Sequence, residues 1–572
     1  MDPSATYLLL RKALVVAGLG LFLVFPGLGD RWFGAGWRGL GLIARRRHVA
    51  VLVTAAVSLA LSLALTVVWG IPRPYAHDEF SYLLAGDTFA HGRLANPTHP
   101  LWEHFETFHV LQVPTYASKY PPGQGLVLAA GQVITGYPIV GVWLSTALAC
   151  GAACWMLFAW LPPRWALAGG LLIAGHPVLL EWSRSYWGGA VAFAGGALVF
   201  GAVGRLARMT RVRDGVVLGL GLVILANSRP YEGAVFGAAA LGILLWQAIA
   251  RRSTVAQLWK ATLALLAVLS LGGVATGIYY YRVTGHPLQM PYEVHEAAYA
   301  VTPLFIWQHP RAEPTYRHAA IRDFHLTVEM TAYRQQQSLE GWLANARGRY
   351  GELLALHFPT TLRYLVGAVV LLALPVLRRD RRLASIAVAL GLFFVGTLPQ
   401  VFMSFRYTAP AASVLFLLAL RSFWHVRLWK WRGRPVGRSV VRIALISCVA
   451  AFILTIVRWE VADPEGLRLR RWAADRAEII DSLSLREGKH LVIVRYGPHH
   501  SPHKEWVYNE AVIDDARVVW AREMDRPHVC ELLAYFKDRH VWLLSVENDG
   551  ERPQIRPYAD GSPETCGRRD LR

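Results

Sequence analysis

Residues 49–71 read VAVLVTAAVSLALSLALTVVWGI, an apolar run that directly follows the basic cluster Arg45-Arg46-Arg47-His48. A helix needs about 20 predominantly apolar residues to cross the hydrocarbon core of a bilayer. Clusters of Lys and Arg remain in the cytoplasm, so this run is predicted to cross from the inside to the outside. The polar segment that follows it is therefore expected on the outer side.

The composition indicates that this run is one of many. The chain has 572 residues, of which 54% are hydrophobic and only 17% are charged, whereas soluble domains carry about 25% charged residues. Apolar runs of about 17 to 23 residues recur along the first four-fifths of the chain. The sequence predicts an all-α polytopic membrane protein with about 11 to 12 transmembrane helices and a small C-terminal α/β extracytoplasmic domain.

The basic residues orient these spans. Alternation from residues 49–71 places the clusters at 205–213, 251–260, 378–382 and 421–438 on the cytoplasmic side. The net charge of +20 is therefore interpreted as a topology signal and not as a nucleic-acid surface, because the basic residues lie in short groups between apolar runs. The predicted location is the inner (plasma) membrane, as a multi-pass protein with membrane lipids around it.

Several spans have definite predicted bounds. Full spans are expected at 138–160 and 163–180, another at 360–377, and a last one at 440–457 that exports the C-terminus. The apolar run 123–134 is too short for a span and is predicted to lie at the interface or to re-enter.

Three regions follow from this pattern. Residues 1–48 form an N-terminal apolar and basic segment on the cytoplasmic side, 49–458 form the membrane domain with outer loops 72–137 and 282–358, and 459–572 form the outer domain. In the last region the β-rich runs are 490–496, 517–521 and 540–546, with a helix at 526–538. Cys530 and Cys566 are the two cysteines of a polar region, where a disulfide is compatible with the sequence.

The unusual polar motifs all fall on the predicted outer side. They are His77-Asp78-Glu79-Phe80-Ser81-Tyr82, Lys119-Tyr120-Pro121-Pro122, Arg229-Pro230-Tyr231-Glu232 and Arg406-Tyr407. A solvated loop start is the alternative interpretation of the first motif, since charges at a membrane boundary cost little. The presence of the other three motifs at outer helix ends favours a functional site.

These motifs, in this order and with this topology, resemble those of the C-type integral membrane glycosyltransferase superfamily, which includes lipid A aminoarabinose transferases and protein O-mannosyltransferases. The resemblance covers about residues 49 to 425 and rests on Asp78-Glu79, the Lys-x-Pro-Pro sequence and Arg406-Tyr407 followed by Pro410. It implies that Asp78 is the essential carboxylate and that Lys119 contacts a lipid phosphate. In this chain Tyr120 stands between Lys119 and the prolines, which departs from the family pattern.

The resemblance also implies a further acidic residue in the next outer loop, after Ser183-Arg184; this chain lacks it there, and Glu181 is the carboxylate that could substitute. The metal site therefore stays unknown, with a divalent cation as the candidate cofactor. The loop 282–358 carries the aromatics Tyr299, Phe305, Trp307 and Tyr316, which are interpreted either as membrane-belt residues or as a lid over substrates. His499, His500 and His503 are interpreted as a polar turn in preference to a metal site.

The chemistry of glycosyl transfer asks for these residue types. A carboxylate removes the proton of an acceptor hydroxyl as the new bond forms, and Asp78 beside Glu79 is the candidate base. Fixed cations stabilise the departing phosphate, and Lys119, Arg406 and Tyr407 are the candidates for that role. Arg406 as an interfacial anchor is the alternative. The candidate substrate contacts are His77, Tyr82, Arg184, Arg229 and Glu232.

Two interpretations of Arg229 and Glu232 stay open: substrate contact, or an ion pair that fixes helices. The predicted function is transfer of a monosaccharide from a polyprenyl-phosphate-linked sugar to a glycan, lipid or protein acceptor at the extracytoplasmic face, with inversion implied by the resemblance. The alternatives are a lipid-linked glycan flippase or transporter, and a non-catalytic receptor. Flippases and transporters usually place ionisable groups near mid-membrane with repeat symmetry, which this sequence does not show.

Overall fold

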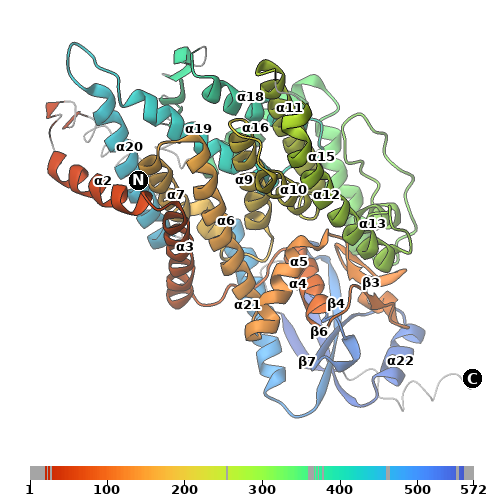
Figure 1. Ribbon diagram of the computed structural model, residues 1–572. Coiled ribbons are helices and arrows are strands. Elements are labelled where there is room, and N and C mark those ends of the chain that lie inside the picture. Colours follow the sequence, from red (N-terminus) through yellow and green to blue (C-terminus); the bar gives the residue numbers. More distant parts are fainter. Residues whose placement is uncertain are drawn as a thin grey trace, which may run out of the picture.

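The computed structural model describes residues 20–21, 24–25, 27, 29–252, 255–357, 366–367, 369–371, 373–376, 379–458, 464–548 and 553–558. A helical bundle forms the larger part of the molecule, and a smaller layer of helices and strands lies at one end of it (Figure 1). Most of the predicted span at 360–377, much of the segment 1–48 and Cys566 lie outside the described residues.

The bundle consists of α2 (Asp30–Ala44), α3 (Arg47–Trp69), α6 (Pro138–Trp160), α7 (Pro163–Ala174), α8 (Pro177–Trp182), α9 (Gly189–Leu206), α10 (Val212–Ala226), α11 (Pro230–Ala250), α12 (Val255–Thr284), α18 (Arg381–Thr397), α19 (Ala409–Val426), α20 (Val436–Arg458) and the short turns η3 (Leu374–Val376) and η4 (Phe405–Thr408). Six described stretches are long and apolar enough to cross a membrane: Arg47–Trp69, Pro138–Trp160, Gly189–Leu206, Pro230–Ala250, Leu258–Thr284 and Phe405–Val426. The predicted polytopic helical fold is confirmed.

Prolines fix where many of these helices begin. Pro138, Pro163 and Pro230 occupy the first helical position of α6, α7 and α11, where the missing N–H costs nothing. The predicted single span at 163–180 is wrong, because Pro177 starts a new helix and the chain is divided into α7 and α8. The break follows from the ring of proline, which cannot continue a helix without losing a backbone hydrogen bond.

Small residues allow the helices to approach closely. At Gly196 of α9 an added Cβ would lie 1.8 Å from the carbonyl oxygen of Pro410 in α19, so only glycine fits this crossing. The crossing draws the beginning of α19, and with it the turn η4, against the bundle.

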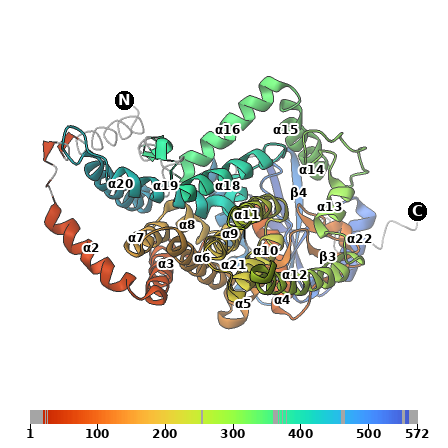
Figure 2. The same ribbon diagram turned by 45° about the horizontal axis from the view of Figure 1, so that its top comes forward.

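The layer at the end of the bundle consists of α4 (His77–Ala90), α5 (Pro122–Thr135), the 3-10 turn η1 (Trp102–Phe105) and the strands β1 (Asn96–Pro97), β2 (Val110–Leu111) and β3 (Thr115–Ser118). The strands pair antiparallel in the order β1-β3-β2. The segment after α12 adds α13 (Pro291–Tyr299), α14 (Ala319–Asp323), the π-helical turn η2 (Phe324–Glu329), α15 (Met330–Gln335) and α16 (Leu339–His357). Both views place α12 and α13 beside β3 (Figures 1 and 2).

The C-terminal region forms the predicted α/β arrangement. It contains α21 (Pro464–Ser484), β4 (Lys489–His499), η5 (Ile513–Asp515), β5 (Val518–Arg522), α22 (Arg526–Tyr535), β6 (Arg539–Asn548) and β7 (Gln554–Pro557). The sheet has the order β5-β4-β6-β7, with β4 parallel to both β5 and β6 and with β7 antiparallel to β6. The strands and the helix fall where the alternation of apolar residues predicts them.

This sheet shares one hydrophobic core with residues 72–137, the segment that the sequence predicts to be the first outer loop. Phe80 and Leu84 of α4 and Phe105 of η1 are buried together with residues of β4, β5 and α22. The ring of Phe80 stacks on Tyr508 with 4.1 Å between centroids. Arg522 of β5 is 2% exposed, forms an ion pair with Glu505, and donates from Nε to the carbonyl oxygen of Glu106 at 2.7 Å. The C-terminal region is therefore attached directly to α4, the helix that carries Asp78.

Candidate active site

Glu79 joins the start of α4 to the bundle. Its Oε2 accepts hydrogen bonds from the backbone N–H groups of Tyr75 (2.9 Å) and Ala76 (3.3 Å). Its Oε1 accepts from the Ser185 hydroxyl (2.8 Å) and the Tyr186 N–H (3.0 Å). The carboxylate is 1% exposed and has four donors, so its geometry is that of a structural anchor.

Asp78, the neighbouring carboxylate, points to a different environment. It is only partly buried, and the Tyr120 hydroxyl donates a hydrogen bond to its Oδ1. Burial raises the pKa of the Asp78 carboxyl above its usual value, while the Tyr120 hydrogen bond and the charges of Lys119 and Arg229 offset only part of that rise. Among the described residues, Tyr120 is the one side chain that donates to Asp78. A fixed carboxylate with a raised pKa and spare acceptor capacity suits proton transfer.

Lys119 is buried and paired. Its Nζ lies 3.4 Å from Oε1 of Glu296 in α13, and 4.7 Å from the centroid of the Tyr292 ring. Burial opposes ionisation of Glu296, but the charge of Lys119 and the His295 imidazole, whose Nδ1 lies 3.7 Å from Glu296 Oε1, hold the pKa of that carboxyl below its usual value. The Glu296 carboxylate therefore stays ionised opposite Lys119, whose charge also acts on Asp78.

Arg229 lies at the first residue before α11 and is 8% exposed. Its guanidinium carbon is 4.4 Å from the centroid of the Tyr407 ring, which is a cation–π contact. Its Nη2 is buried without a hydrogen-bond partner. A buried guanidinium N–H without an acceptor is costly unless an anion or water completes it, so Arg229 is prepared to bind an anion.

Arg406 and Tyr407 are adjacent in η4, but their side chains contact different partners. Arg406 donates from Nη2 to Oε1 of Glu181 at 2.7 Å, and its guanidinium carbon lies 4.3 Å from the centroid of the Trp187 ring. Tyr407 contacts Arg229. The predicted phosphate pair of Lys119 and Arg406 is thus divided between Glu296 and Glu181.

The remaining candidate contacts have structural partners. His77 Nδ1 is 2.7 Å from the Tyr508 hydroxyl, and Tyr82 stacks on Tyr120 at 4.6 Å between centroids. Arg184 donates from Nη1 to the carbonyl oxygens of Leu65 and Gly70, each at 3.2 Å, at the end of α3.

Glu232 completes this group. It accepts from Gln400 Nε2 at 2.8 Å. In the described part of the chain no ion pair within 4 Å joins Arg229 to Glu232. The interpretation of these two residues as a helix-fixing pair is therefore not supported.

The aromatic loop residues divide into two groups. Tyr299 donates to Glu106 Oε1 at 2.8 Å, and Tyr316 donates to the carbonyl oxygen of Tyr299 at 2.6 Å, so both pack on the first outer loop. Phe305 and Trp307 stack on each other at 5.0 Å, and Trp307 is 63% exposed. The first group covers the loop 72–137, and in the second group Trp307 has the exposure of a membrane-belt residue while Phe305 packs on Tyr231.

The described residues form no metal centre. Within the described ranges, no group of three His, Cys, Asp or Glu side chains lies close enough to hold an ion. His500 Nε2 is 3.0 Å from the carbonyl oxygen of Lys504, which closes a local turn. Metal dependence stays a prediction.

Sequence reasoning missed the partners that hold this site together. Tyr120 was noted only as a departure from the family motif, and Glu296 gave no signal because it lies 177 residues beyond Lys119. His295 and His109 are buried near Lys119. Burial is the main cause that lowers the pKa of each imidazole, and the positive charge of Lys119 is the second cause. These residues converge only through the packing of α13 on the first outer loop.

A cavity of about 540 Å³ lies on the other side of α4. It is lined by Phe80, Leu84 and Asp87 of α4 and by Tyr508 and Trp520 of the C-terminal region. Because Asp78 and Tyr82 face Tyr120 instead, α4 separates the cavity from the Asp78 cluster. This cavity is an open groove between the first outer loop and the C-terminal sheet.

No protein-family model and no curated protein matches the chain. Among solved structures it is similar to the Archaeoglobus fulgidus oligosaccharyltransferase in complex with zinc and sulfate, at 15% identity and a TM-score of 0.49 over 87% of this chain and 67% of that chain. It is also similar to ArnT from Cupriavidus metallidurans bound to undecaprenyl phosphate, at 11% identity and a TM-score of 0.48 over 86% and 92%.

A third similar structure is the archaeal oligosaccharyltransferase AglB from Archaeoglobus fulgidus with an inhibitory peptide and a dolichol-phosphate, at 13% identity and a TM-score of 0.42 over 88% of this chain and 69% of that one. ArnT is a lipid A aminoarabinose transferase, one of the protein groups that the sequence motifs resemble. At identities of 15% or less and TM-scores below 0.5, these likenesses assign no activity to the chain.

Proposed function

We propose that this chain is a membrane glycosyltransferase that moves a monosaccharide from a polyprenyl-phosphate donor to an acceptor hydroxyl at the Asp78 end of the bundle. The observation that carries the proposal is the Asp78 carboxylate, which is held by Tyr120 and lies in the field of Lys119 and Arg229. A base and fixed cations at one helix end are the groups that glycosyl transfer from a phosphate requires.

Asp78 acts as the general base in this mechanism. It accepts the proton of the acceptor hydroxyl as that oxygen attacks the anomeric carbon. The new glycosidic C–O bond forms while the bond from the anomeric carbon to the phosphate oxygen breaks, and its electron pair leaves with the lipid phosphate. Attack on the face opposite the phosphate inverts the anomeric configuration. The Tyr120 hydroxyl fixes the carboxylate in the orientation that this transfer needs.

Arg229 is the first candidate for the lipid phosphate. Its Nη2 has no partner and is buried, so a phosphate oxygen would complete its hydrogen bonding with a charge-assisted bond. Lys119 adds positive potential while paired with Glu296. Arg406, which is already paired with Glu181, is the second candidate contact.

The substrates follow from this arrangement. A polyprenyl donor keeps its chain in the bilayer and presents its phosphate at the membrane surface, where the helix ends place these cations. The acceptor is a hydroxyl of a glycan, a lipid or a protein. In this proposal the Asp78 end and the C-terminal region face the outside of the inner membrane, an orientation that the basic clusters at the opposite helix ends favour.

Asp78→Asn tests the proposal, with Glu103→Gln, a carboxylate change in the same loop, as the matched control. Asn keeps the shape of Asp but cannot accept the proton, so transfer of label from polyprenyl-phosphate sugars is expected to fall by about a hundredfold or more. The melting temperature should stay the same, and Glu103→Gln should transfer normally. Normal transfer by Asp78→Asn would rule out the mechanism. Translocation of labelled donor without cleavage would instead identify a flippase.

A further inference from the structure

Four arginines meet at the end of the bundle that is opposite to Asp78. They are Arg208, Arg251, Arg381 and Arg382, and they line one cavity of about 190 Å³ together with Trp160 and Trp246. Arg229 precedes α11 and Arg251 follows it, so the two ends lie 21 helical residues apart, or about 30 Å at 1.5 Å per residue.

The cavity lacks a counter-charge. No Asp or Glu lines it, and no carboxylate in the described ranges lies within 4 Å of its four guanidinium groups. The nearest acid in sequence, Asp380, is already engaged: Oδ2 accepts from Arg421 at 2.8 and 2.6 Å and lies 2.7 Å from His425 Nε2. Partial desolvation, followed by the charges of Arg382, Arg47, Arg421 and Arg251, holds the pKa of the Arg208 guanidinium below its usual value. An anion in the cavity would relieve this repulsion.

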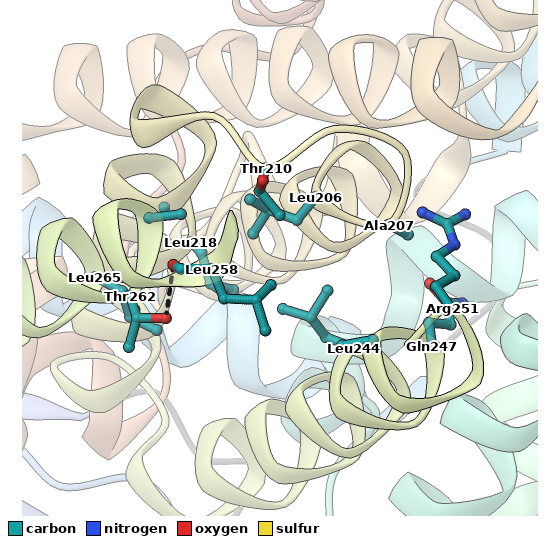
Figure 3. A pocket seen from close by; sticks show the side chains of 13 residues that line it. Leu206, Ala207, Thr210, Leu218, Leu244, Gln247, Arg251, Leu258, Thr262 and Leu265 are labelled. Carbon is teal, nitrogen blue, oxygen red and sulfur yellow. Dashed lines mark hydrogen bonds between the residues drawn. The ribbon is translucent and has the colours of Figure 1, made fainter. Parts of the chain in front are cut away.

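An apolar pocket adjoins the arginine cavity. It is lined by leucines of α9, α10, α11 and α12, and it shares Ala207, Gln247 and Arg251 with the cavity. Figure 3 shows Arg251 and Ala207 on one side of this pocket and Leu218, Leu258 and Leu265 on the other. Its volume is about 70 Å³, which admits a segment of one hydrocarbon chain.

Gln247, one of the three residues shared by both cavities, has an unsatisfied acceptor. Gln247 donates from Nε2 to the Ser385 hydroxyl at 3.1 Å, whereas its Oε1 is buried without a partner. A headgroup hydroxyl would provide the missing donor. Arg251, Gln247 and Leu244 thus follow one another from the end of α11 into the bundle and offer a cation, a free acceptor and an apolar surface in that order.

We propose that this pair of cavities is a binding site for an anionic phospholipid with a hydroxylated headgroup. The phosphate lies among Arg208, Arg251, Arg381 and Arg382, and one acyl chain enters the leucine-lined pocket between α10, α11 and α12. Basic pockets between membrane helices suit anionic headgroups, because the guanidinium groups keep their charge and form paired hydrogen bonds with phosphate. The site is separate from the Asp78 cluster and does not depend on the proposed glycosyl transfer.

Lipid binding to the purified full-length protein in detergent tests this site. The probe is dioleoyl phosphatidylglycerol, and dioleoyl phosphatidylcholine with the same chains is the control. Native mass spectrometry is expected to show at least about tenfold tighter retention of phosphatidylglycerol, and the melting temperature should rise with that lipid alone. Equal retention of both lipids would overturn the proposal. Equal stabilisation by inorganic phosphate, or tighter binding of a polyprenyl phosphate, would also overturn it.

Two charge variants distinguish the cavity from a basic surface. Arg381→Gln combined with Arg382→Gln removes two cavity arginines, and it should weaken phosphatidylglycerol binding by about tenfold or more. Arg432→Gln combined with Arg434→Gln removes the same charge from exposed residues of the α19–α20 connection, and it should change binding by less than about threefold. Equal losses in the two double variants would show a general charge effect and contradict a built site.

A volume variant tests the acyl pocket without changing charge. Ala248→Phe places a ring in the leucine-lined pocket and should weaken phosphatidylglycerol binding by about tenfold, because several buried methylene groups are displaced. Ile249→Phe adds the same ring at a position that is 67% exposed, and binding should be unchanged. Retention of full affinity by Ala248→Phe would exclude a chain from this pocket.

Discussion

At the Asp78 end of the bundle, Lys119 lies 3.4 Å from Glu296, and Arg406 lies 2.7 Å from Glu181. At the opposite end, the arginines that line the 190 Å³ cavity have no carboxylate among the residues that line it. A carboxylate partner fixes the position of a cation and offsets much of its electrostatic potential. A cation without such a partner can form its ion pair with an external anion. Arg229 differs from Lys119 and Arg406 because, among the described residues, no carboxylate pairs with it within 4 Å, and its Nη2 is buried without an acceptor.

This comparison predicts the largest effect at Arg229. Arg229→Gln removes the unpartnered cation, and kcat/KM for donor lipid should fall by about 10- to 100-fold, the loss expected for one or two hydrogen bonds to a charged group. Arg229→Lys keeps the charge without the planar fork and should recover part of the activity. Unchanged kcat/KM in Arg229→Gln would mean that Arg229 only packs against Tyr407. The absence of a carboxylate partner would then not identify a phosphate-binding cation.

Glu79→Gln should affect stability before chemistry. The amide would direct N–H groups at backbone and hydroxyl donors that now bond the carboxylate, so the free energy of unfolding should fall by about 1 to 3 kcal/mol. Denaturant unfolding in detergent measures this loss, and Asp78→Asn, with its single described donor, is the control that should unfold normally. A Glu79→Gln protein of normal stability that transfers no sugar would place Glu79 in the reaction instead.

Tyr120→Phe should shift the pH dependence of transfer. The mutation removes a hydrogen bond that lowers the pKa of Asp78, so that pKa, already raised by burial, should rise further. Because the base must be ionised, the acid limb of the kcat profile should move to higher pH by about one unit. Above the limb the rate should be close to that of the unmodified protein.

Tyr279→Phe is the matched control for this prediction, because the Tyr279 hydroxyl donates to the backbone oxygen of Tyr120 at 3.3 Å and not to Asp78. Its acid limb should stay in place. Identical profiles for Tyr120→Phe and the unmodified protein would separate Asp78 from the titration that limits transfer.

The smallest effect is expected at the Arg406–Glu181 pair. Glu181 is 28% exposed at its side chain, so a double-mutant cycle with Arg406→Lys and Glu181→Gln should give a coupling of about 0.5 to 1 kcal/mol in stability. If Arg406 only pairs with Glu181, Arg406→Lys should leave donor KM unchanged. A KM increase that persists in the Glu181→Gln background would place Arg406 on the donor phosphate and make it a second ligand-facing cation.

The helices were predicted best where the signal is local. The run 138–160 coincides with α6, and the run 49–71 overlaps α3 but is displaced from it by two residues at each end. The strand runs at 490–496, 517–521 and 540–546 fall within β4, β5 and β6, apart from Arg517. Length and periodicity suffice there, because each element buries its own apolar residues. The span at 163–180 failed because hydropathy averages over Pro177, which ends one helix and begins another.

The candidate site was predictable only in part. Asp78 and Arg229 could be predicted because they belong to charged motifs at the ends of apolar runs, and such motifs are visible in the sequence alone. Glu296, Tyr292 and the contact of Tyr120 with Asp78 come from segments that the sequence keeps apart. The division of Arg406 and Tyr407 between two clusters depends on the short turn η4, whose conformation no periodicity encodes.

The sequence by itself determined that this protein has many membrane-spanning helices, which residues carry charge at the helix ends, and that an α/β unit follows the bundle. Those features depend on local composition, and the bilayer enforces them through the cost of burying unpaired polar groups. Only the tertiary structure decided which cations are neutralised and which are not. Ion pairs such as Lys119–Glu296 act over a few ångströms between residues far apart in the chain, so their formation depends on packing that no single segment contains.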